Sequence, residues 1–241
     1  MANLNGNLEV WQSNNLVEAA QSMTLNEKRL VIAAAALHDP RKPLPEKGTV
    51  TLHADEFANV FGITSRGHLY EAVKEAAERL FNRRIRQVRD SPRGKGKQIV
   101  RDIRWVWMAT YNPGQGTVTL GFTPDVAPHL VLLHNQFTRY KLKHIGRIGS
   151  FYGFRMYELC AQFRTAGTRF IKEPDLREML DLGDKYPRID SLRQRVLDPA
   201  ISEINKHTDL RVKMTSETKG RKVIGFHFTI TVEPQQELDL H

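Results

Sequence analysis

The sequence predicts an α+β protein of two similar units, each a helix-turn-helix followed by a β-hairpin. Two segments carry apolar side chains at helical spacing, and a shorter helix and a turn precede each of them. Strand-like segments that alternate apolar and polar residues follow both. A basic segment from Gln136 to Gly149, interrupted by glycines, separates the units. We therefore expect two domains, at residues 10–140 and 147–233.

The first unit opens with a helix whose start and end are both marked. Thr24 is a favourable N-cap and Glu27 follows three residues later, which is the spacing of a capping box. The helix should stop at Asp39, because the residue before a proline disfavours the helical region. A short strand and a short helix should follow, over Thr49–Leu52 and Asp55–Phe61.

A longer helix should begin after Gly62, where Thr64 or Ser65 can cap it. Its apolar positions recur at helical spacing: Leu69, Val73, Ala76 and Leu80. Its other positions mix acids with bases: Arg66, Glu71, Lys74, Glu75, Glu78 and Arg79. This mixture suits a solvated or protein-facing helix better than a helix in a DNA groove. We expect the first unit to supply a weaker DNA contact and a partner surface.

Three strands should complete the first unit, over Arg83–Asp90, Ile99–Ala109 and Thr117–Phe122. Trp105 and Trp107 fall two apart on the second strand, hence on one face, and we expect both in the core. The turn before that strand carries three cations that can touch phosphates: Arg93, Lys95 and Lys97. A helix-turn-helix followed by such strands is the winged-helix plan.

The second unit repeats this plan. Ser150 can cap a helix that runs through Phe163, and Pro174–Leu180 is a short helix with proline near its first turn. The long helix that follows should bury five apolar positions: Ile189, Leu192, Val196, Ala200 and Ile204. Pro199 interrupts this pattern and predicts a kink or a restart. Two strands should then form a hairpin, Leu210–Met214 and Ile224–Val232, with a polar tip at Thr215–Lys222.

The basic surplus lies where it can meet a polyanion. The net charge is +9, and the segment from Arg188 to Lys222 holds nine basic residues against five acids. At about 100° per residue, the long helix opposes its apolar side with a polar face: Arg188, Ser191, Arg195 and Ser202. Arg193 lies nearer the apolar side and would reach DNA from the N-terminal end. Because arginine makes bidentate bonds to guanine, we expect this helix to read bases of double-stranded DNA.

The second hairpin places more cations beside that helix. Arg211 and Lys213 share one face of its first strand, and three cations crowd its tip: Lys219, Arg221 and Lys222. A basic wing next to a basic helix can clamp phosphates while bases are read. The alternative is that both elements are ordinary solvated charged surfaces.

Catalytic patterns are absent from the sequence. No two histidines flank a single apolar residue, as the metal site of a nicking enzyme requires, and His129 and His134 are five apart. No GxxxxGK[ST] loop is present to hold ATP phosphates. Cys160 is the only cysteine and lies in an apolar stretch, so we expect a packed thiol without a disulfide or a cysteine zinc site. We expect no enzyme, no metal and no cofactor.

No segment has the 18 consecutive apolar residues of a membrane span, and the first ten residues lack the pattern of a secretory signal. We therefore expect a cytoplasmic protein that does not bind membranes.

One run stands out in the second unit: Asp-Pro-Ala-Ile-x-Glu-Ile-Asn, from Asp198 to Asn205. Five further segments accompany it: Asn14–Ala19, Leu25–Leu30, Ser150–Leu159, Asp175–Leu180 and Thr208–Leu210. Together these segments are similar to iteron-binding plasmid replication initiators, which use theta-type replication, and the run from Asp198 is the most specific of them. The resemblance covers most of the chain, from Asn14 to Val232.

The resemblance implies tandem winged helices that bind repeated duplex sites, the iterons, at a plasmid origin. The second domain would dominate binding. Carried onto this sequence, the base-reading and wing candidates are Arg188, Arg193, Arg195, Lys219, Arg221 and Lys222. The first domain would support binding, or form dimers that do not initiate and that repress the protein's own gene. The implied partners are a second copy of the chain and the host initiator, helicase and chaperones.

Two other functions stay open. A transcriptional repressor without a replication role would use the same helices and hairpins, so no residue separates it from an initiator. A nicking enzyme is opposed by the missing metal site.

The last nine residues carry a separate motif. Pro234 should end the last strand, and the polar remainder should be mobile. Gln235, Leu238 and Leu240 resemble the Gln-x-x-Leu-x-Leu peptides that bind bacterial sliding clamps, which adds the clamp as a candidate partner. The alternative is an ordinary solvated terminus.

Overall fold

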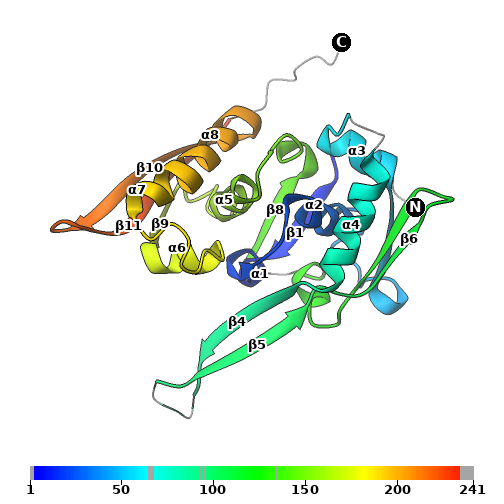
Figure 1. The fold of residues 1–241 in the computed structure, drawn as a ribbon, viewed down its shortest axis with the longest axis horizontal. Helices are drawn as coiled ribbons and strands as arrows, with labels where there is room; N and C mark the ends of the chain where they lie inside the picture. Colours follow the sequence, from blue (N-terminus) through cyan, green and yellow to red (C-terminus); the bar gives the residue numbers. More distant parts are fainter. Residues whose placement is uncertain (1–2, 65–67, 93, 95, 134, 234–241) are drawn as a thin grey trace.

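The computed structural model describes residues 3–64, 68–92, 94, 96–133 and 135–233. The described residues form four small sheets, with strand orders β1-β8, β2-β4-β5, β3-β7-β6 and β10-β11-β9. Figure 1 shows α7, α8 and the β10–β11 hairpin at one end of the molecule, and α3, α4 and β6 at the other. The structure is therefore a mixture of helix and small sheets, as the sequence predicts.

The first half begins with four elements: β1 (Glu9–Ser13), α1 (Asn14–Glu18), β2 (Ala20–Gln21) and α2 (Leu25–Ala36). The capping box of α2 is confirmed, because Thr24 Oγ1 accepts from the Glu27 N–H at 3.4 Å and the Glu27 carboxylate accepts from the Thr24 N–H at 3.1 Å. Every residue of α2 from Glu27 to Ala36 is buried, so this helix is the centre of the first half.

The first helix-turn-helix is α3 (Ala54–Phe61) and α4 (Leu69–Phe81), preceded by β3 (Thr49–His53). Gly62 ends α3 as predicted, with a φ of 62° that glycine adopts without strain. The N-cap of α4 is His68, without a side-chain hydrogen bond, so Thr64 does not cap this helix as expected. Ser65 lies outside the described residues.

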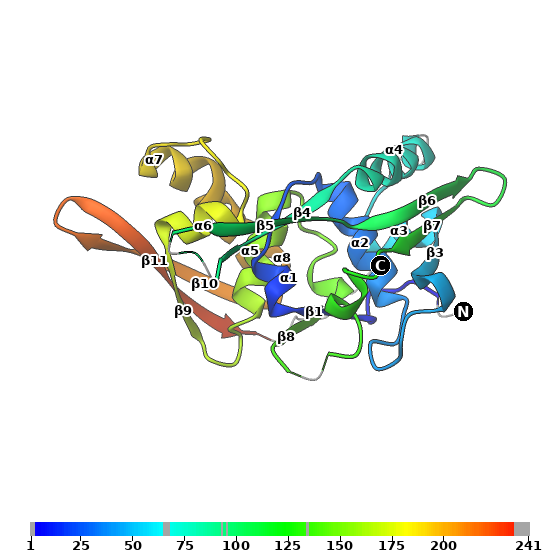
Figure 2. The same cartoon turned by 90° about the horizontal axis from the view of Figure 1, so that it is seen from below.

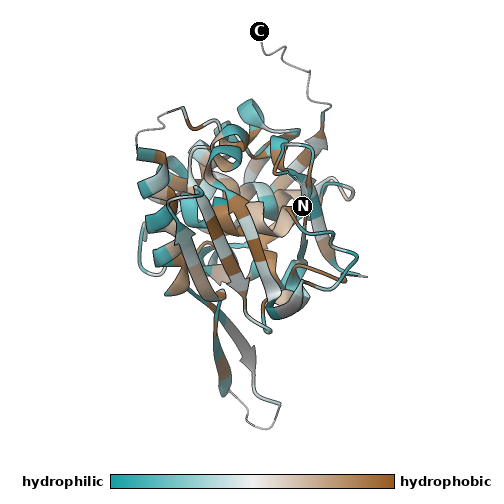
Figure 3. Cartoon of the chain, turned by 90° about the vertical axis from the view of Figure 1, so that its right-hand side faces the viewer, coloured by the Kyte–Doolittle hydropathy of each residue, from teal (hydrophilic) through white to brown (hydrophobic). Residues whose placement is uncertain are grey.

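One predicted strand is two strands in the structure. β5 (Gln98–Arg104) pairs with β4 (Arg84–Asp90), whereas β6 (Val106–Asn112) pairs with β7 (Thr117–Phe122) in another sheet. The prediction of a single strand over Ile99–Ala109 is therefore wrong, because the chain leaves one sheet at the buried Trp105 and enters the next. Trp107 is 44% exposed, so only Trp105 is in the core. Figure 3 shows the β4–β5 hairpin projecting from the body.

Another strand lies within Gln136–Gly149, the basic segment where the sequence predicts the domain boundary. β8 (Phe137–Lys141) pairs antiparallel with β1, and the rings of Trp11 and Phe137 stack across this sheet with centroids 4.5 Å apart. Short 3-10 turns also occur among the described residues of the first half: η1 (Glu46–Gly48), η3 (Ala127–His129) and η4 (Leu142–His144).

The second half contains the expected helix-turn-helix and hairpin. Its helices are α5 (Phe151–Ala161), α6 (Glu173–Met179), α7 (Ile189–Leu192), the π-helical η5 (Arg193–Leu197) and α8 (Asp198–His207). Its strands are β9 (Thr168–Lys172), β10 (Leu210–Lys219) and β11 (Lys222–Val232). The predicted polar tip at Thr215–Lys222 is mostly strand, which leaves only Gly220 and Arg221 between the strands. Pro234 lies outside the described residues.

Gly153 in α5 lets a carboxylate of α8 approach closely. Ser150 caps α5 as predicted, accepting from the Gly153 N–H at 2.9 Å, and donates its own hydroxyl to Glu203 at 2.8 Å. A Cβ at position 153 would lie 2.1 Å from that Glu203 oxygen. The glycine therefore gives up helix propensity and permits a contact that ties α5 to α8.

A cluster of fully buried charges joins α5 to the first half. Glu158 accepts from Lys28 of α2 at 3.0 Å and from Arg155 at 2.9 Å, while Gln12 and Tyr140 donate to its other oxygen at 2.7 and 2.8 Å. Burial lowers the pKa of Lys28 to about 8. Burial raises the pKa of Glu158, but the two cations more than offset this and hold it below its ordinary value.

Candidate nucleic-acid interface

The long helix of the second half runs from Ile189 to His207 with one turn of π-helix in its middle. In that turn the Asp198 N–H donates to the Arg193 carbonyl, five residues back. Pro199 follows and has no N–H to donate to the Arg195 carbonyl four residues back. The interruption predicted at Pro199 is confirmed, and it takes the form of a wider turn just before the proline.

The three arginines of this helix differ in their surroundings. Arg188 is 80% exposed and lies 3.5 Å from Asp190, an exposed pair that costs little to give up. Arg195 is exposed and has no ion pair among the described residues. Arg193 is half as exposed as Arg188 and lies 3.6 Å from Asp198. Ser191 is half-buried. Arg188 and Arg195 are therefore the two guanidiniums most accessible to a ligand.

The wing beside this helix presents four accessible cations. Lys213 is exposed on β10, Lys219 and Lys222 face each other at the end of the ladder, and Arg221 lies in the turn. Arg211 is different, because it donates to the Thr208 carbonyl at 3.0 Å and pairs with Glu233 at 3.0 Å. Of the five wing candidates, Arg211 is thus the one held by internal contacts among the described residues.

Two of the five acids in this segment do not oppose the cations at the surface. Asp209 is buried and accepts from Tyr157 at 2.9 Å and Arg164 at 2.5 Å. Glu203 faces Ser150 on α5. The outward surface of the helix and wing is therefore more basic than the composition alone indicates.

Asn205 holds the wing against the helix. Its amide donates to the Val212 carbonyl at 2.9 Å, and its oxygen accepts from the Val212 N–H at 2.6 Å. A shallow groove runs between α8 and β10, lined in part by Ser202, Lys206 and Lys213. Periodicity does not reveal the role of Asn205, whose only signal in the sequence is its place at the end of the Asp198–Asn205 motif.

The helix-turn-helix of the first half has a more mixed surface. On α4, Lys74 pairs with Glu71 at 3.3 Å and Arg79 with Glu75 at 2.9 Å. On the β4–β5 hairpin, Arg86 forms a bidentate pair with Asp102 at 2.9 and 3.1 Å. At the tip of this hairpin Lys97 is exposed, whereas Arg93 and Lys95 lie outside the described residues.

Other reactive side chains are placed as structural groups. Among the residues that the structure describes, no three His, Cys, Asp or Glu side chains are placed to hold a metal ion. His129 shares a hydrogen bond of 2.7 Å with the Ser13 hydroxyl, and His134 is not among the described residues. Cys160 is buried, and burial raises the pKa of its thiol to about 12, which makes it a packed thiol as expected.

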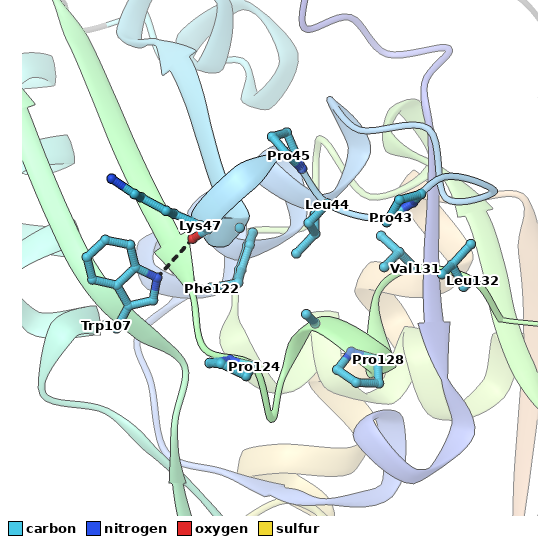
Figure 4. Close-up of a pocket in the computed structure, with 12 residues that line it drawn as sticks. Pro43, Leu44, Pro45, Lys47, Trp107, Phe122, Pro124, Pro128, Val131 and Leu132 are labelled. Carbon is cyan, nitrogen blue, oxygen red and sulfur yellow. Dashed lines mark hydrogen bonds between the residues drawn. The ribbon is translucent and has the colours of Figure 1, made fainter.

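A pocket of about 730 Å³ in the first half has the wrong chemistry for a polyanion. It is lined mainly by apolar side chains, with Leu44, Phe122 and Val131 among them, and Trp107 stands at its side (Figure 4). The Trp107 indole donates to the Lys47 carbonyl at 3.1 Å. Trp107 is therefore a pocket wall rather than a core residue.

None of the described helices combines the length and the apolar character that a membrane span needs.

Known proteins resemble the chain along most of its length. The family model "Initiator Replication protein, WH1" matches residues 9–161, and "Initiator Rep protein, WH2" matches residues 173–230. The Replication initiation protein of Escherichia coli is 25% identical over an alignment of 238 residues, which covers 96% of this chain and 72% of that protein. The PI protein of Escherichia coli is 25% identical over an alignment of 268 positions, gaps included, which covers 98% of this chain and 87% of that protein.

A solved structure confirms the fold. The crystal structure of the Pi initiator protein in complex with iteron DNA matches with a TM-score of 0.79 at 24% identity, over 96% of this chain and 100% of that one. The two predicted winged-helix domains are thereby confirmed. Since the WH1 model alone matches more than half of the sequence, the chain belongs to the family of initiator replication proteins, with its paired WH1 and WH2 domains.

Proposed function

We propose that this protein initiates plasmid replication by binding repeated duplex sites, the iterons, at its origin, without catalysing a reaction itself. The observation that carries the proposal is that Arg188 and Arg195 stand exposed on one helix beside a wing of accessible cations. An arginine face can read guanine edges in the major groove while the wing neutralises phosphates. The family and the iteron complex of the similar Pi initiator support it.

We assign most of the binding to the second domain, residues 147–233, and a supporting contact to the first, residues 10–140. Figure 2 shows α4 and α7 on the same side of the molecule, with β1 and β8 on the opposite side. A duplex along the α4 and α7 side can therefore meet both helix-turn-helix units. The paired charges of α4 make its contact the weaker one.

The test is replication itself. The gene and its upstream repeats are placed on a plasmid that cannot otherwise replicate, and colonies are counted with intact and with scrambled repeats. Growth that depends on intact repeats supports an initiator. If a reporter behind the repeats is repressed but no plasmid is maintained, the protein is a transcriptional repressor.

We also propose self-association through the first domain, with the dimer repressing the protein's own gene. β5 is an edge strand of its sheet, and it exposes Ile99 and Val100, the latter to 55%. An edge strand with exposed apolar side chains is a ready template for pairing with a second chain.

Host proteins complete the proposal: the host initiator, the helicase and, through Gln235, Leu238 and Leu240, the sliding clamp. These three tail residues lie outside the described residues, so their motif is the support for this contact. A synthetic peptide of residues 235–241 is titrated against purified clamp. Binding that Leu238→Ala and Leu240→Ala abolish supports recruitment, and equal behaviour of all peptides refutes it.

A further inference from the structure

The π turn of the long helix contains one residue more than an α-helical turn. Its bond from the Asp198 N–H to the Arg193 carbonyl spans five residues instead of four. An inserted residue delays every later side chain by about 100° around the helix axis. Such turns are rare in proteins, and many of those that occur lie at functional sites.

The pattern of buried residues along the helix agrees with this rotation. Leu192 and Val196 are buried before the end of the turn, and three residues are buried after them: Leu197, Ala200 and Ile204. In an uninterrupted α-helix the second group would point about 90° away from the first. The inserted residue brings the two groups to within about 20° of each other. The core therefore requires the extra residue.

An ion pair gives independent support. Arg193 and Asp198 lie 3.6 Å apart although they are five residues apart in the sequence. In an uninterrupted α-helix, side chains five apart point about 140° from each other and do not meet. The wider turn brings them to the same side.

The exposed side chains are divided by the same delay. Arg188, Ser191 and Arg195 stay together on one stripe ahead of the turn's end. Ser202, predicted to share their face, is turned away by about 100° and lines the groove beside β10 together with Lys206 and Lys213. The predicted polar face is thus wrong beyond Leu197, because a rotation of about 100° at every residue assumes an uninterrupted α-helix.

We propose that the π turn is a specificity determinant: it leaves Arg195 on the stripe of Arg188 and Ser191, and it turns Ser202 and Lys206 to the wing. The first stripe then reads bases and the second holds the backbone beside the wing. This inference rests on the proposed function, because it names the part of the DNA-binding surface that sets which bases are read.

Deletion of Gln194 tests it. Gln194 is exposed, and its removal leaves the turn with the number of residues of an ordinary α-helix. The buried side chains should then keep their directions: Leu192, Leu197, Ala200 and Ile204. Arg195 then turns toward the wing, and Val196 takes a direction close to the one that Arg195 had. We expect the iteron affinity to fall about tenfold to a hundredfold, as for Arg195→Ala, with little change on random duplex. Gln194→Ala keeps the turn and should bind like the parent.

A matched rescue separates direction from stability. In the chain that lacks Gln194, Val196→Arg places a guanidinium back on the first stripe, and both shortened chains lose the same valine from the core. Binding is measured by fluorescence anisotropy on iteron and random duplexes, with thermal melts monitored by circular dichroism. We expect the arginine to recover iteron affinity. Parent-like binding of the deletion, or a folded rescue variant that recovers nothing, overturns the inference.

An exchange at constant length covers the case in which the shortened chains do not fold. Gln194→Arg combined with Arg195→Gln moves the guanidinium by one position without touching the core or the charge. We expect this double variant to bind iteron duplex more weakly than the parent and random duplex equally well. Parent-like binding to iteron duplex overturns the inference. A different result would contradict the proposed function itself: iteron binding that neither Arg188→Ala nor Arg195→Ala changes.

Discussion

Single side chains carry the base reading that we propose. Arg188 is 80% exposed and pairs with the equally solvated Asp190, and Arg195 is exposed without an ion pair among the described residues. Arg193, paired with Asp198, and Arg211, paired with Glu233, are only about half as exposed as Arg188, so both are less accessible to DNA. Exposure and ion pairing thus distinguish arginines by their accessibility to DNA, which the sequence composition does not do.

Replacement of Arg188 or of Arg195 should reduce specificity. We expect Arg188→Ala and Arg195→Ala each to cost about 1–3 kcal/mol on the iteron duplex and little on random duplex, because a bidentate bond to guanine is removed. Titrations on both duplexes at one salt concentration measure the difference. Arg139→Ala is the control, since Arg139 is an exposed arginine on β8, on the opposite side (Figure 2). Equal losses on both duplexes would show that the arginines touch phosphate only.

At the scale of elements, the helix and the wing act as one unit because Asn205 bonds both backbone groups of Val212. The long β10–β11 ladder carries its cations to the very end of the hairpin, where Lys219 and Lys222 face each other. Cations on a projecting hairpin suit phosphates better than base edges.

The wing should therefore determine salt dependence rather than specificity. Alanine at Lys219, Arg221 and Lys222 together should weaken binding to iteron and random duplex alike. The slope of log K against log salt should shrink by roughly one unit for each phosphate that the wing no longer neutralises. Triple alanine at Arg139, Lys141 and Lys143 removes the same charge from the β8 side as a control. A slope that both triple variants change equally would place the wing away from DNA.

At the scale of the whole molecule, the buried cluster around Glu158 ties the halves together. Lys28 belongs to α2, and Arg155 donates to the backbone carbonyls of Val17, Ala19 and Met179, so one cluster reaches elements from both halves. A buried charge that loses its partner is costly. The relative placement of the halves should depend on this carboxylate.

Glu158→Gln should therefore destabilise the entire protein. Loss of the negative charge leaves Lys28 and Arg155 buried without a counter-ion, and we expect a cost of about 3–5 kcal/mol in the free energy of unfolding. Urea denaturation measures it. Glu71→Gln breaks an exposed pair and should cost less than about 1 kcal/mol. Similar midpoints for the two variants would contradict a role of the cluster in stability.

Self-association also belongs to the whole molecule. A charge on the exposed edge strand, as in Val100→Asp, should lower the dimer fraction because it would be buried unpaired at the interface. Sedimentation equilibrium across a range of protein concentrations measures the change. Val232→Asp alters an apolar residue of the second half with similar exposure, 47% against 55%, and should leave the dimer unchanged. The opposite pattern would place the interface on the second half.

Local chemistry in the sequence determined much of the fold. The capping box at Thr24, the glycine end at Gly62, the cap at Ser150 and the interruption at Pro199 are confirmed because each depends on neighbours within a few residues. The basic helix and hairpin of the second half were also predictable, since helical and strand periodicities determine which side chains share a face.

Contacts between distant segments decided the rest. The break at Trp105 depends on two sheets that compete for one stretch of chain, and β1 is a strand because β8 lies beside it. Gly153 becomes a point of close approach only once Glu203 of α8 is packed against α5. The direction of Ser202 depends on an inserted residue that the core selects. A periodic pattern assumes that each element is uninterrupted, and packing determines where it is not.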